Sequence, residues 1–304
     1  MSHEIKKKTV LITGSSGLLG SEIINQLLGE ENFNVIGMTS KVEQLTEKYS
    51  EVNLKVVSNK DWVTKLNESN EQVDILINCA FPRSSKSEEL ALGIPFTEQL
   101  IKDSIDFGIQ NIINISSQSV YTQKDKEDAT EESNVQPESL YGMTKYACER
   151  VVALLCEEHN INYSNIRLGS LTGLNFDVRM TNRFVKMAIE SEPITINGGD
   201  QLISYLEVRD AAEALIKMIE IDKCEWEKQY NLGNNNSFSL NKLIEVIKTT
   251  GREYGVHNIE VVYKEDNSNF NNSLTSDLFY QEFNWKPKYY VEEMVEELFE
   301  KYIK

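Results

Sequence analysis

Histidine, cysteine and long apolar runs are scarce in this sequence of 304 residues, and each scarcity excludes a class of protein. The three histidines lie far apart along the chain, so neither a histidine-based metal site nor a Ser-His-Asp triad is expected. The four cysteines lack C-x-x-C spacing, which indicates reduced thiols in a cytoplasmic protein. No apolar run approaches the ~18 residues of a membrane helix, and residues 1–4 are polar, so neither membrane association nor a signal peptide is expected.

Positive charge is also in deficit. The chain carries 48 acidic and 31 basic residues, for a formal net charge of -17. The only basic cluster, residues 6–8, is too short to attract a polyanion against that background. A surface of this sign repels phosphate backbones, so nucleic acid is excluded as an expected partner.

Short apolar runs alternate with amphipathic stretches over the first two-thirds of the chain. Residues Ile23, Ile24, Leu27 and Leu28, for example, fall on one face of a helix. The expected strands cover residues 9–13, 34–38, 54–57, 73–78, 111–116 and 162–168. Strands that alternate with helices form right-handed βαβ units, so the fold class predicted is α/β, a Rossmann-type doubly wound parallel sheet.

The alternation breaks down after about residue 170, which indicates a second, smaller unit. We expect a dinucleotide-binding Rossmann domain over residues 1–170, with a return segment near 205–235. Residues 171–204 and 236–304 would then form a C-terminal lobe that binds the substrate.

A glycine-rich turn joins the first expected strand to the first expected helix. Gly14, Gly17 and Gly20 have G-x-x-G-x-x-G spacing, which allows a tight turn, a close approach to a pyrophosphate and close packing of helix on strand. The helix N-terminus adds partial positive charge, so no basic side chain is needed. The residues expected to bind the cofactor phosphates are Gly14, Ser15, Ser16, Gly17, Leu18 and Leu19.

The second expected strand distinguishes between the two nicotinamide cofactors. An acidic residue at its end would bind the ribose 2′-hydroxyl of NAD, but Thr39, Ser40 and Lys41 stand there. Two hydroxyls and a cation suit a 2′-phosphate, which favours NADP over NAD. An exposed lysine can equally serve solubility alone, so both cofactors stay open.

Tyr141 and Lys145 form a Y-x-x-x-K pair, and Ser117 ends the fifth expected strand. Residues i and i+4 share a helix face, so the phenol and the ammonium would lie side by side. An ordinary tyrosine has a pKa of about 10, and a neighbouring cation favours the phenolate, which can take a proton from a substrate hydroxyl. Ser117 could hold the same oxygen. The alternative interpretation is a surface Tyr–Lys pair without chemistry.

These motifs, TGSSGLLG, NCA, SSQSVY and YGMTK, together resemble the extended short-chain dehydrogenase/reductases, the NAD(P)-dependent epimerase/dehydratase proteins that act largely on nucleotide sugars. The resemblance extends over nearly the whole chain. It implies Ser117, Tyr141 and Lys145 as the catalytic set, with Lys145 also binding the nicotinamide ribose and with Cys79 and Ala80 in the cofactor site. It further implies a homodimer formed through helices near residues 97–108 and 141–157.

The sequence departs from the family pattern at several positions. Gln118 and Ser119 replace the Asp-Glu pair of the 4,6-dehydratases, which excludes that elimination, and Ser119 also replaces the cysteine of the fucose-forming epimerase/reductases. Ile203 stands where many relatives have a diphosphate-binding arginine. The expected substrate-binding residues are Arg83, Ser117, Gln118, Arg179 and Arg183, the last two as replacements for that arginine unless they are ordinary exposed charges.

The resulting hypothesis is an enzyme that transfers hydride at a sugar carbon, most plausibly C4, of a nucleotide-activated sugar. Epimerisation with bound NAD and net ketoreduction with NADPH both fit. The alternatives are an NADPH-dependent reductase of a small non-nucleotide carbonyl, which Ile203 favours, and a non-catalytic dinucleotide-sensing protein. The sugar, the nucleotide and the stereochemistry stay open.

Overall fold

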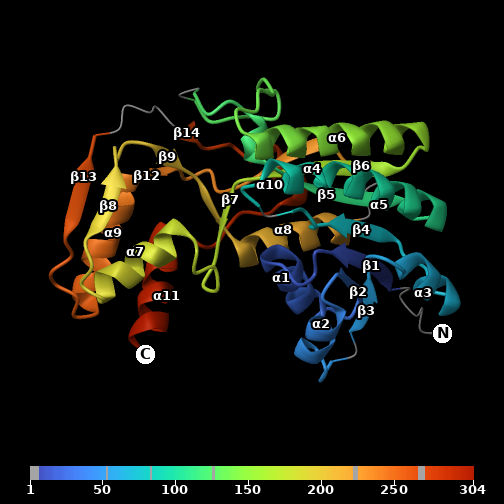
Figure 1. The fold of residues 1–304 in the computed structure, drawn as a ribbon, viewed down its shortest axis with the longest axis horizontal. Helices are drawn as coiled ribbons and strands as arrows, with labels where there is room; N and C mark the ends of the chain where they lie inside the picture. The colour runs from blue at the N-terminus through green and yellow to red at the C-terminus, as the bar shows by residue number, and fades with distance from the viewer. Residues whose placement is uncertain (1–6, 53, 83, 125–126, 222–224, 266–270) are drawn as a thin grey trace. The chain divides into compact units, whose positions relative to one another are not determined.

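The computed structural model describes residues 7–52, 54–82, 84–124, 127–221, 225–265 and 271–304, and the chain divides into two compact units (Figure 1). The first unit contains residues 1–120, 137–167 and 212–230, and the second contains residues 121–136, 168–211 and 231–304. Among the described residues, no helix combines the length and the apolar content that crossing a bilayer would require.

A seven-stranded sheet forms the centre of the first unit. Its strands are β1 (Lys8–Thr13), β2 (Phe33–Thr39), β3 (Lys55–Ser58), β4 (Ile75–Asn78), β5 (Asn111–Ser117), β6 (Asn162–Leu168) and β11 (Gln229–Leu232). They are arranged in the order β11-β6-β5-β4-β1-β2-β3, and the pairs from β3 to β5 are parallel. The strand order reverses between β1 and β4, as in a doubly wound fold, so the predicted fold class is confirmed.

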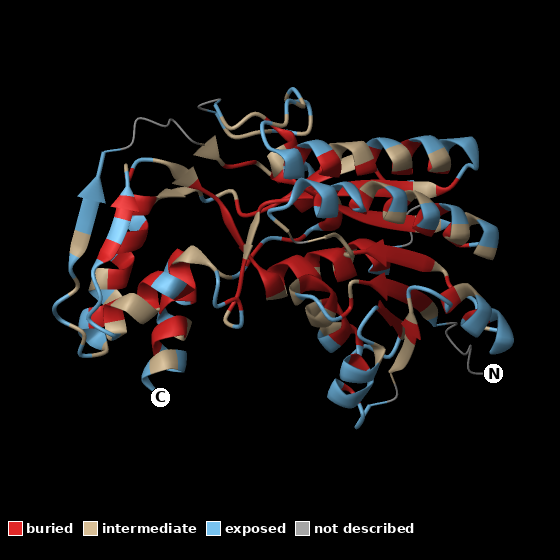
Figure 2. Cartoon of the chain, viewed as in Figure 1, coloured by how far each residue is buried: buried red, intermediate tan, exposed pale blue. Residues whose placement is uncertain are grey.

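Helices cover both faces of this sheet. They are α1 (Leu18–Leu27), α2 (Val42–Lys48), α3 (Trp62–Glu68), α4 (Ser87–Ala91), α5 (Gly93–Phe107), α6 (Leu140–Glu158) and α8 (Val208–Glu220), with a short 3₁₀ helix, η1 (Gln118–Val120). Ile36 and Met38 of β2 share a core with α3, α5 and α6. Successive strand residues point to opposite faces, and Gly37 accordingly contacts side chains of α1 and α2. Figure 2 shows the resulting buried sheet between exposed helix faces.

The face of the sheet under α5 and α6 changes from apolar to polar toward the carboxyl ends of the strands. Leu11, Leu76, Ile112 and Tyr163 belong to one apolar core. Two residues further along the same strands is a buried polar row of Thr13, Asn78, Asn114 and Asn165. Thr13 donates to Asn78 (2.7 Å), Asn78 to Asn114 (3.0 Å) and Asn114 to Asn165 (2.8 Å). Such a satisfied row holds four strand ends in register directly below the edge where ligands bind in α/β sheets.

The described part of the second unit contains small sheets packed with helices. Its strands are β7 (Ser170–Thr172), β8 (Ile194–Asn197), β9 (Leu202–Ile203), β10 (Tyr205–Glu207), β12 (Phe238–Ser239), β13 (Val261–Lys264) and β14 (Asn271–Asn272), and its helices are α7 (Met180–Ile189), α9 (Leu240–Glu253), α10 (Asp277–Phe283) and α11 (Val291–Ile303). Apolar faces of α7, α9 and α11 meet in one core, and the two-residue strand β9 pairs with both β12 and β14.

Candidate active site

The glycine-rich turn follows β1 and leads into α1. Gly14 has a positive φ of 63°, and a Cβ there would lie 2.9 Å from the backbone of both Cys79 and Ala80. A Cβ at Gly20 would lie 2.5 Å from the Gly14 carbonyl oxygen, so only glycine fits where helix meets turn. Gly17 is the N-cap of α1, exposed and without a side-chain cap bond. The turn therefore presents bare backbone at a helix N-terminus, as a pyrophosphate site requires.

Two serines attach this turn to the end of β2. The Ser15 hydroxyl donates to the Met38 carbonyl oxygen (2.7 Å) and the Ser15 N–H to the same oxygen (3.3 Å). The Ser16 and Thr39 hydroxyls are 3.0 Å apart, and Thr39 also accepts from the Lys41 N–H at 3.0 Å. Ser15 and Thr39 thus hold the turn in place, while the Ser16, Ser40 and Lys41 side chains are exposed.

The segment that follows β4 connects the glycine turn to the predicted catalytic residues. The Ala80 N–H donates to Thr13, next to Gly14 (3.1 Å). One residue later, the Phe81 ring lies 4.0 Å from the Lys145 ammonium and 5.6 Å from the Tyr141 ring. β1 and β4 flank the point where the strand order reverses, so the glycine turn and the segment that contacts the Tyr–Lys pair both lie at that reversal.

Tyr141 and Lys145 occupy the first turns of α6, whose N-terminus is capped by Ser139 accepting from the Gly142 N–H (3.1 Å). Tyr141 is 36% exposed and Lys145 only 6%. The Lys145 ammonium donates to the Ile115 carbonyl oxygen of β5 (2.8 Å). Burial lowers the pKa of Lys145 to about 8, although its neighbours Cys148, Cys79 and Glu149 favour the charged form. Burial likewise raises the pKa of Cys79 to about 12, so this thiol is neutral at physiological pH.

Ser117 and Gln118 lie at the end of β5 and the start of η1, against the N-terminus of α6. A Cβ at Gly142 would lie 2.1 Å from the Ser119 carbonyl oxygen, which shows how closely the two elements pack. The Ser117 hydroxyl donates to the Ser119 hydroxyl at 3.2 Å. Ser117 is 9% exposed and Gln118 is 6% exposed. The three predicted catalytic residues therefore gather at one edge of one unit.

A buried ion pair behind these residues was missing from the sequence-based expectations. Glu149 accepts from Arg167 at 3.1 and 2.8 Å and from the Ser116 hydroxyl at 2.5 Å. The two charged side chains are 4% and 5% exposed. The spacing of Tyr141, Lys145 and Glu149, four residues apart each, could have indicated Glu149 because it places all three on one helix face. No spacing or motif in the sequence indicated a role for Phe81.

The predicted substrate-binding arginines lie apart from this edge in the sequence and belong to different parts of the chain. Arg179 is half-buried at the N-cap of α7, where its guanidinium lies 5.4 Å from the Phe176 ring and 5.5 Å from the Tyr205 ring. Its Nε donates to the Leu171 carbonyl oxygen at 2.5 Å. Arg183 is exposed. Arg83 lies outside the described residues.

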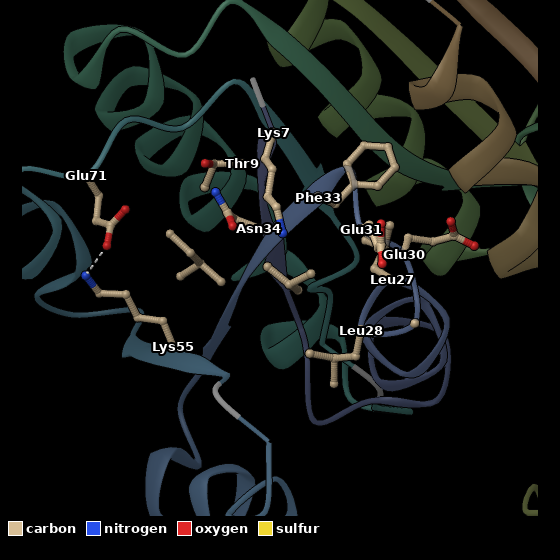
Figure 3. A pocket seen from close by; sticks show the side chains of 13 residues that line it. Lys7, Thr9, Leu27, Leu28, Glu30, Glu31, Phe33, Asn34, Lys55 and Glu71 are labelled. Atoms are coloured by element: carbon tan, nitrogen blue, oxygen red, sulfur yellow. Dashed lines mark hydrogen bonds and ion pairs between the residues drawn. The ribbon is translucent and has the colours of Figure 1, made fainter. Parts of the chain in front are cut away.

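A cavity of about 710 Å³ lies at the other end of the central sheet (Figure 3). Its lining includes Thr9 at the start of β1, Asn34 at the start of β2 and Leu28 beyond α1, with the Lys55–Glu71 ion pair on one side. Thr9 and Asn34 lie near the amino ends of parallel strands, and Thr9 is five residues before Gly14, roughly 16 Å at 3.3 Å per residue. The cavity is therefore distinct from the edge that carries the predicted chemistry.

Curated relatives align with most of this chain. It is 25% identical over 254 residues to a protein of Methanocaldococcus jannaschii described as a putative UDP-glucose 4-epimerase, covering 79% of this chain and 81% of that one. It is 22% identical over 319 residues to a dTDP-4-dehydro-6-deoxyglucose reductase of Escherichia coli, covering 97% and 98% of the two chains.

Solved structures show the same fold. UDP-N-acetylglucosamine 4-epimerase from Bacillus cereus superposes with a TM-score of 0.81 at 20% identity, covering 97% of this chain and 96% of that one. UDP-glucose 4-epimerase from Thermotoga maritima, solved with UDP-glucose, gives 0.81 at 21% identity, covering 97% and 100%. The family profile of the NAD dependent epimerase/dehydratase family matches residues 10–233, including the glycine turn, Ser117, Tyr141 and Lys145. The chain therefore belongs to the NAD dependent epimerase/dehydratase family, as its motifs indicated.

Proposed function

We propose that this protein transfers hydride at a sugar carbon, C4, of a nucleotide-activated sugar, with Ser117, Tyr141 and Lys145 as its catalytic residues. One observation carries the proposal. The segment at residues 79–81 contacts the glycine turn at Gly14 and, two residues on, the Tyr141–Lys145 pair. The proposed cofactor site and proton-transfer site are thus neighbours on one sheet edge.

The residues at this edge fit a nicotinamide dinucleotide. The chain's own backbone occupies the positions that a Cβ of Gly14 or Gly17 would take, so the turn stays tight, and Gly17 as the N-cap of α1 leaves the helix N-terminus without a covering side chain. The diphosphate would be held by residues 14–19, the adenosine ribose by Thr39, Ser40 and Lys41, and the nicotinamide ribose by Cys79, Ala80 and Lys145. The nicotinamide supplies the hydride acceptor or donor when bound.

Tyr141 is proposed to take the proton from the sugar hydroxyl and to return it. The Lys145 ammonium, buried and predominantly charged below pH 8, stabilises the phenolate electrostatically. Ser117, at the end of β5, is proposed to hold the same sugar oxygen in exchange for its present hydrogen bond to Ser119. Gln118 follows directly and is proposed to line the sugar site.

Two outcomes of hydride transfer fit this site. A 4-epimerase oxidises and re-reduces the same carbon without net cofactor consumption, whereas a reductase consumes NADPH. The named relatives include both kinds of enzyme. The exposed Ser40 and Lys41 at the end of β2 favour NADP, because a cation and a hydroxyl suit a 2′-phosphate. Mass spectrometry of cofactor released from the purified protein distinguishes bound NAD from NADP.

Arg179 is proposed to bind the substrate diphosphate in the second unit. Two aromatic rings and the Leu171 carbonyl hold its guanidinium in a fixed orientation, which lowers the entropic cost of binding an anion. Arg183 and Arg83 are proposed to contribute further charge to the substrate. The substrate-binding role of the C-terminal lobe is part of this proposal.

A second candidate function is the reduction of a small non-nucleotide carbonyl. Ile203 is 9% exposed and packs in an apolar cluster with Tyr205, Leu240 and Met294, so this position contributes no charge toward a diphosphate. Substitution of Arg179 by Met separates the two candidates. It should raise the KM for a nucleotide sugar at least tenfold, and it should leave the KM for a small carbonyl unchanged.

We also propose a cytoplasmic homodimer that associates through α5 and α6. Met143 and Leu154 of α6 are 51% and 61% exposed, and eleven residues place them on one helix face. Leu154→Glu should convert a dimer to a monomer in sedimentation equilibrium if this face is the interface. Sedimentation of the wild type as a monomer would contradict the proposal directly.

The catalytic assignment is tested with a panel of UDP-, GDP- and dTDP-sugars, followed by NADPH absorbance and product chromatography. Tyr141→Phe should reduce kcat at least 100-fold, because the proton acceptor is removed, and change cofactor affinity less than threefold. Turnover without NADPH consumption identifies an epimerase. Retained turnover in Tyr141→Phe would reject Tyr141 as the base, and dinucleotide binding without turnover on any substrate would favour the sensing alternative.

A further inference from the structure

Phe81 lies against both members of the proposed catalytic pair. The Lys145 ammonium sits 4.0 Å from the centroid of its ring. The Tyr141 ring meets it edge to face, with centroids 5.6 Å apart and an interplanar angle of 85°. One aromatic ring, that of Phe81, thus contacts both residues of the pair.

The Phe81 ring has little freedom to move away. A Cβ at Gly93, the first residue of α5, would lie 2.5 Å from the ring atom Cε2, so the helix backbone closes one side of the ring. Lys145 and Tyr141, both on α6, bound it on other sides. Aromatic pairs and cation–π contacts of this geometry stabilise such a cluster beyond simple burial.

The same contact constrains the ammonium. An ammonium has three N–H donors, and one of them is directed to the Ile115 carbonyl oxygen at 2.8 Å. A second faces the Phe81 ring, whose π surface attracts a cation at this distance. One N–H donor of the ammonium then remains for a further partner.

We propose that Phe81 is a positioning residue, whose ring orients the Lys145 ammonium and packs the Tyr141 phenol beside it. The inference rests on the proposed function of that pair. Phe81 itself takes no part in proton or hydride transfer. Its role is to hold two flexible side chains in the one arrangement that the chemistry uses.

The protonation of Lys145 provides a readout that does not depend on turnover. The titratable groups that act on its ammonium are Cys148 and Glu149 on α6 and Cys79 after β4. A π face stabilises the charged form, so removing the ring while keeping its apolar volume should lower the pKa of Lys145 further.

The test compares Phe81→Leu with Phe96→Leu, a matched control on α5 whose half-buried ring packs in the core of the same unit. The pKa of Lys145 is measured by NMR on protein labelled with ¹³Cε-lysine, with its signal assigned by its loss in Lys145→Arg. Phe81→Leu should lower this pKa by about half a pH unit or more, and Phe81→Tyr and Phe96→Leu should leave it unchanged. On an identified substrate, kcat should fall at least tenfold with KM nearly constant.

An unchanged or raised pKa of Lys145 in Phe81→Leu would overturn the proposal. The ring would then only fill space in the packing or exclude water, and it would not orient the ammonium. An equal shift in Phe96→Leu would overturn it as well. Phe81→Met, of similar volume, replaces Phe81→Leu if the latter does not fold. Failure of the proposed function is recognised separately, as absence of wild-type turnover, and leaves the NMR result valid.

Discussion

Glu149 and Arg167 form an ion pair that is buried between α6 and the end of β6. Nη2 of Arg167 donates to Oε2 of Glu149 at 2.8 Å, and Ser116 donates to the same carboxylate. Ser116 precedes the proposed catalytic Ser117, and Glu149 lies one helical turn beyond Lys145. The pair therefore fixes the strand end and the helix that carry the proposed catalytic residues.

Glu149→Gln should destabilise the protein by about 3–5 kcal/mol, because the Arg167 charge would remain buried without a counter-charge. Urea unfolding measures the difference. The double variant Glu149→Met/Arg167→Met removes both charges and should recover most of the loss. Equal destabilisation by the single and double variants would contradict the prediction, because the loss would then not come from leaving the Arg167 charge unpaired.

Gly14→Ala should reduce cofactor affinity at least tenfold. The new methyl would lie 2.9 Å from the backbone of Cys79 and Ala80, and alanine disfavours a φ of +63°. Gly108→Ala is the matched control, since Gly108 also has a positive φ, +97°, but nothing lies within 4 Å of its added Cβ. Fluorescence titration with NADH and NADPH checks both variants. Similar affinity losses in the two would assign the effect to general backbone strain.

Lys145→Met should raise the free energy of unfolding of the cofactor-free protein at pH 7. This gain over the wild type should disappear as the pH rises from about 8 to above 10. Burial lowers the pKa of Lys145 from 10.5 to about 8, so the folded state is penalised for holding the charge below pH 8. Between these values the unfolded chain binds more protons, and wild-type stability rises with pH. Urea unfolding at pH 7 and pH 10 measures the trend, with exposed Lys102→Met as control. If the difference in the free energy of unfolding between Lys145→Met and the wild type is the same at both pH values, the prediction is contradicted.

Local patterns determined most of the secondary structure. The expected strands at residues 9–13 and 34–38 lie within β1 (Lys8–Thr13) and β2 (Phe33–Thr39), and the expected helix face of Ile23, Ile24 and Leu27 is the buried face of α1. Apolar periodicity predicts these elements because burial selects side chains at the repeat of a helix or strand. The two-residue strands β9, β12 and β14 were not expected, because so short a strand is defined by its partners and not by its own residues.

The sequence by itself determined the fold class and the glycine turn, and it proposed Ser117, Tyr141 and Lys145 as a candidate set, because turn chemistry and helical spacing are local properties. Only the tertiary structure decided that Phe81 touches both Tyr141 and Lys145, that Ser15 and Thr39 hold the turn, and that Glu149 pairs with Arg167. These contacts join residues from different strands and helices. Their partners are chosen by packing and by the need to pair buried charges, which no local pattern encodes.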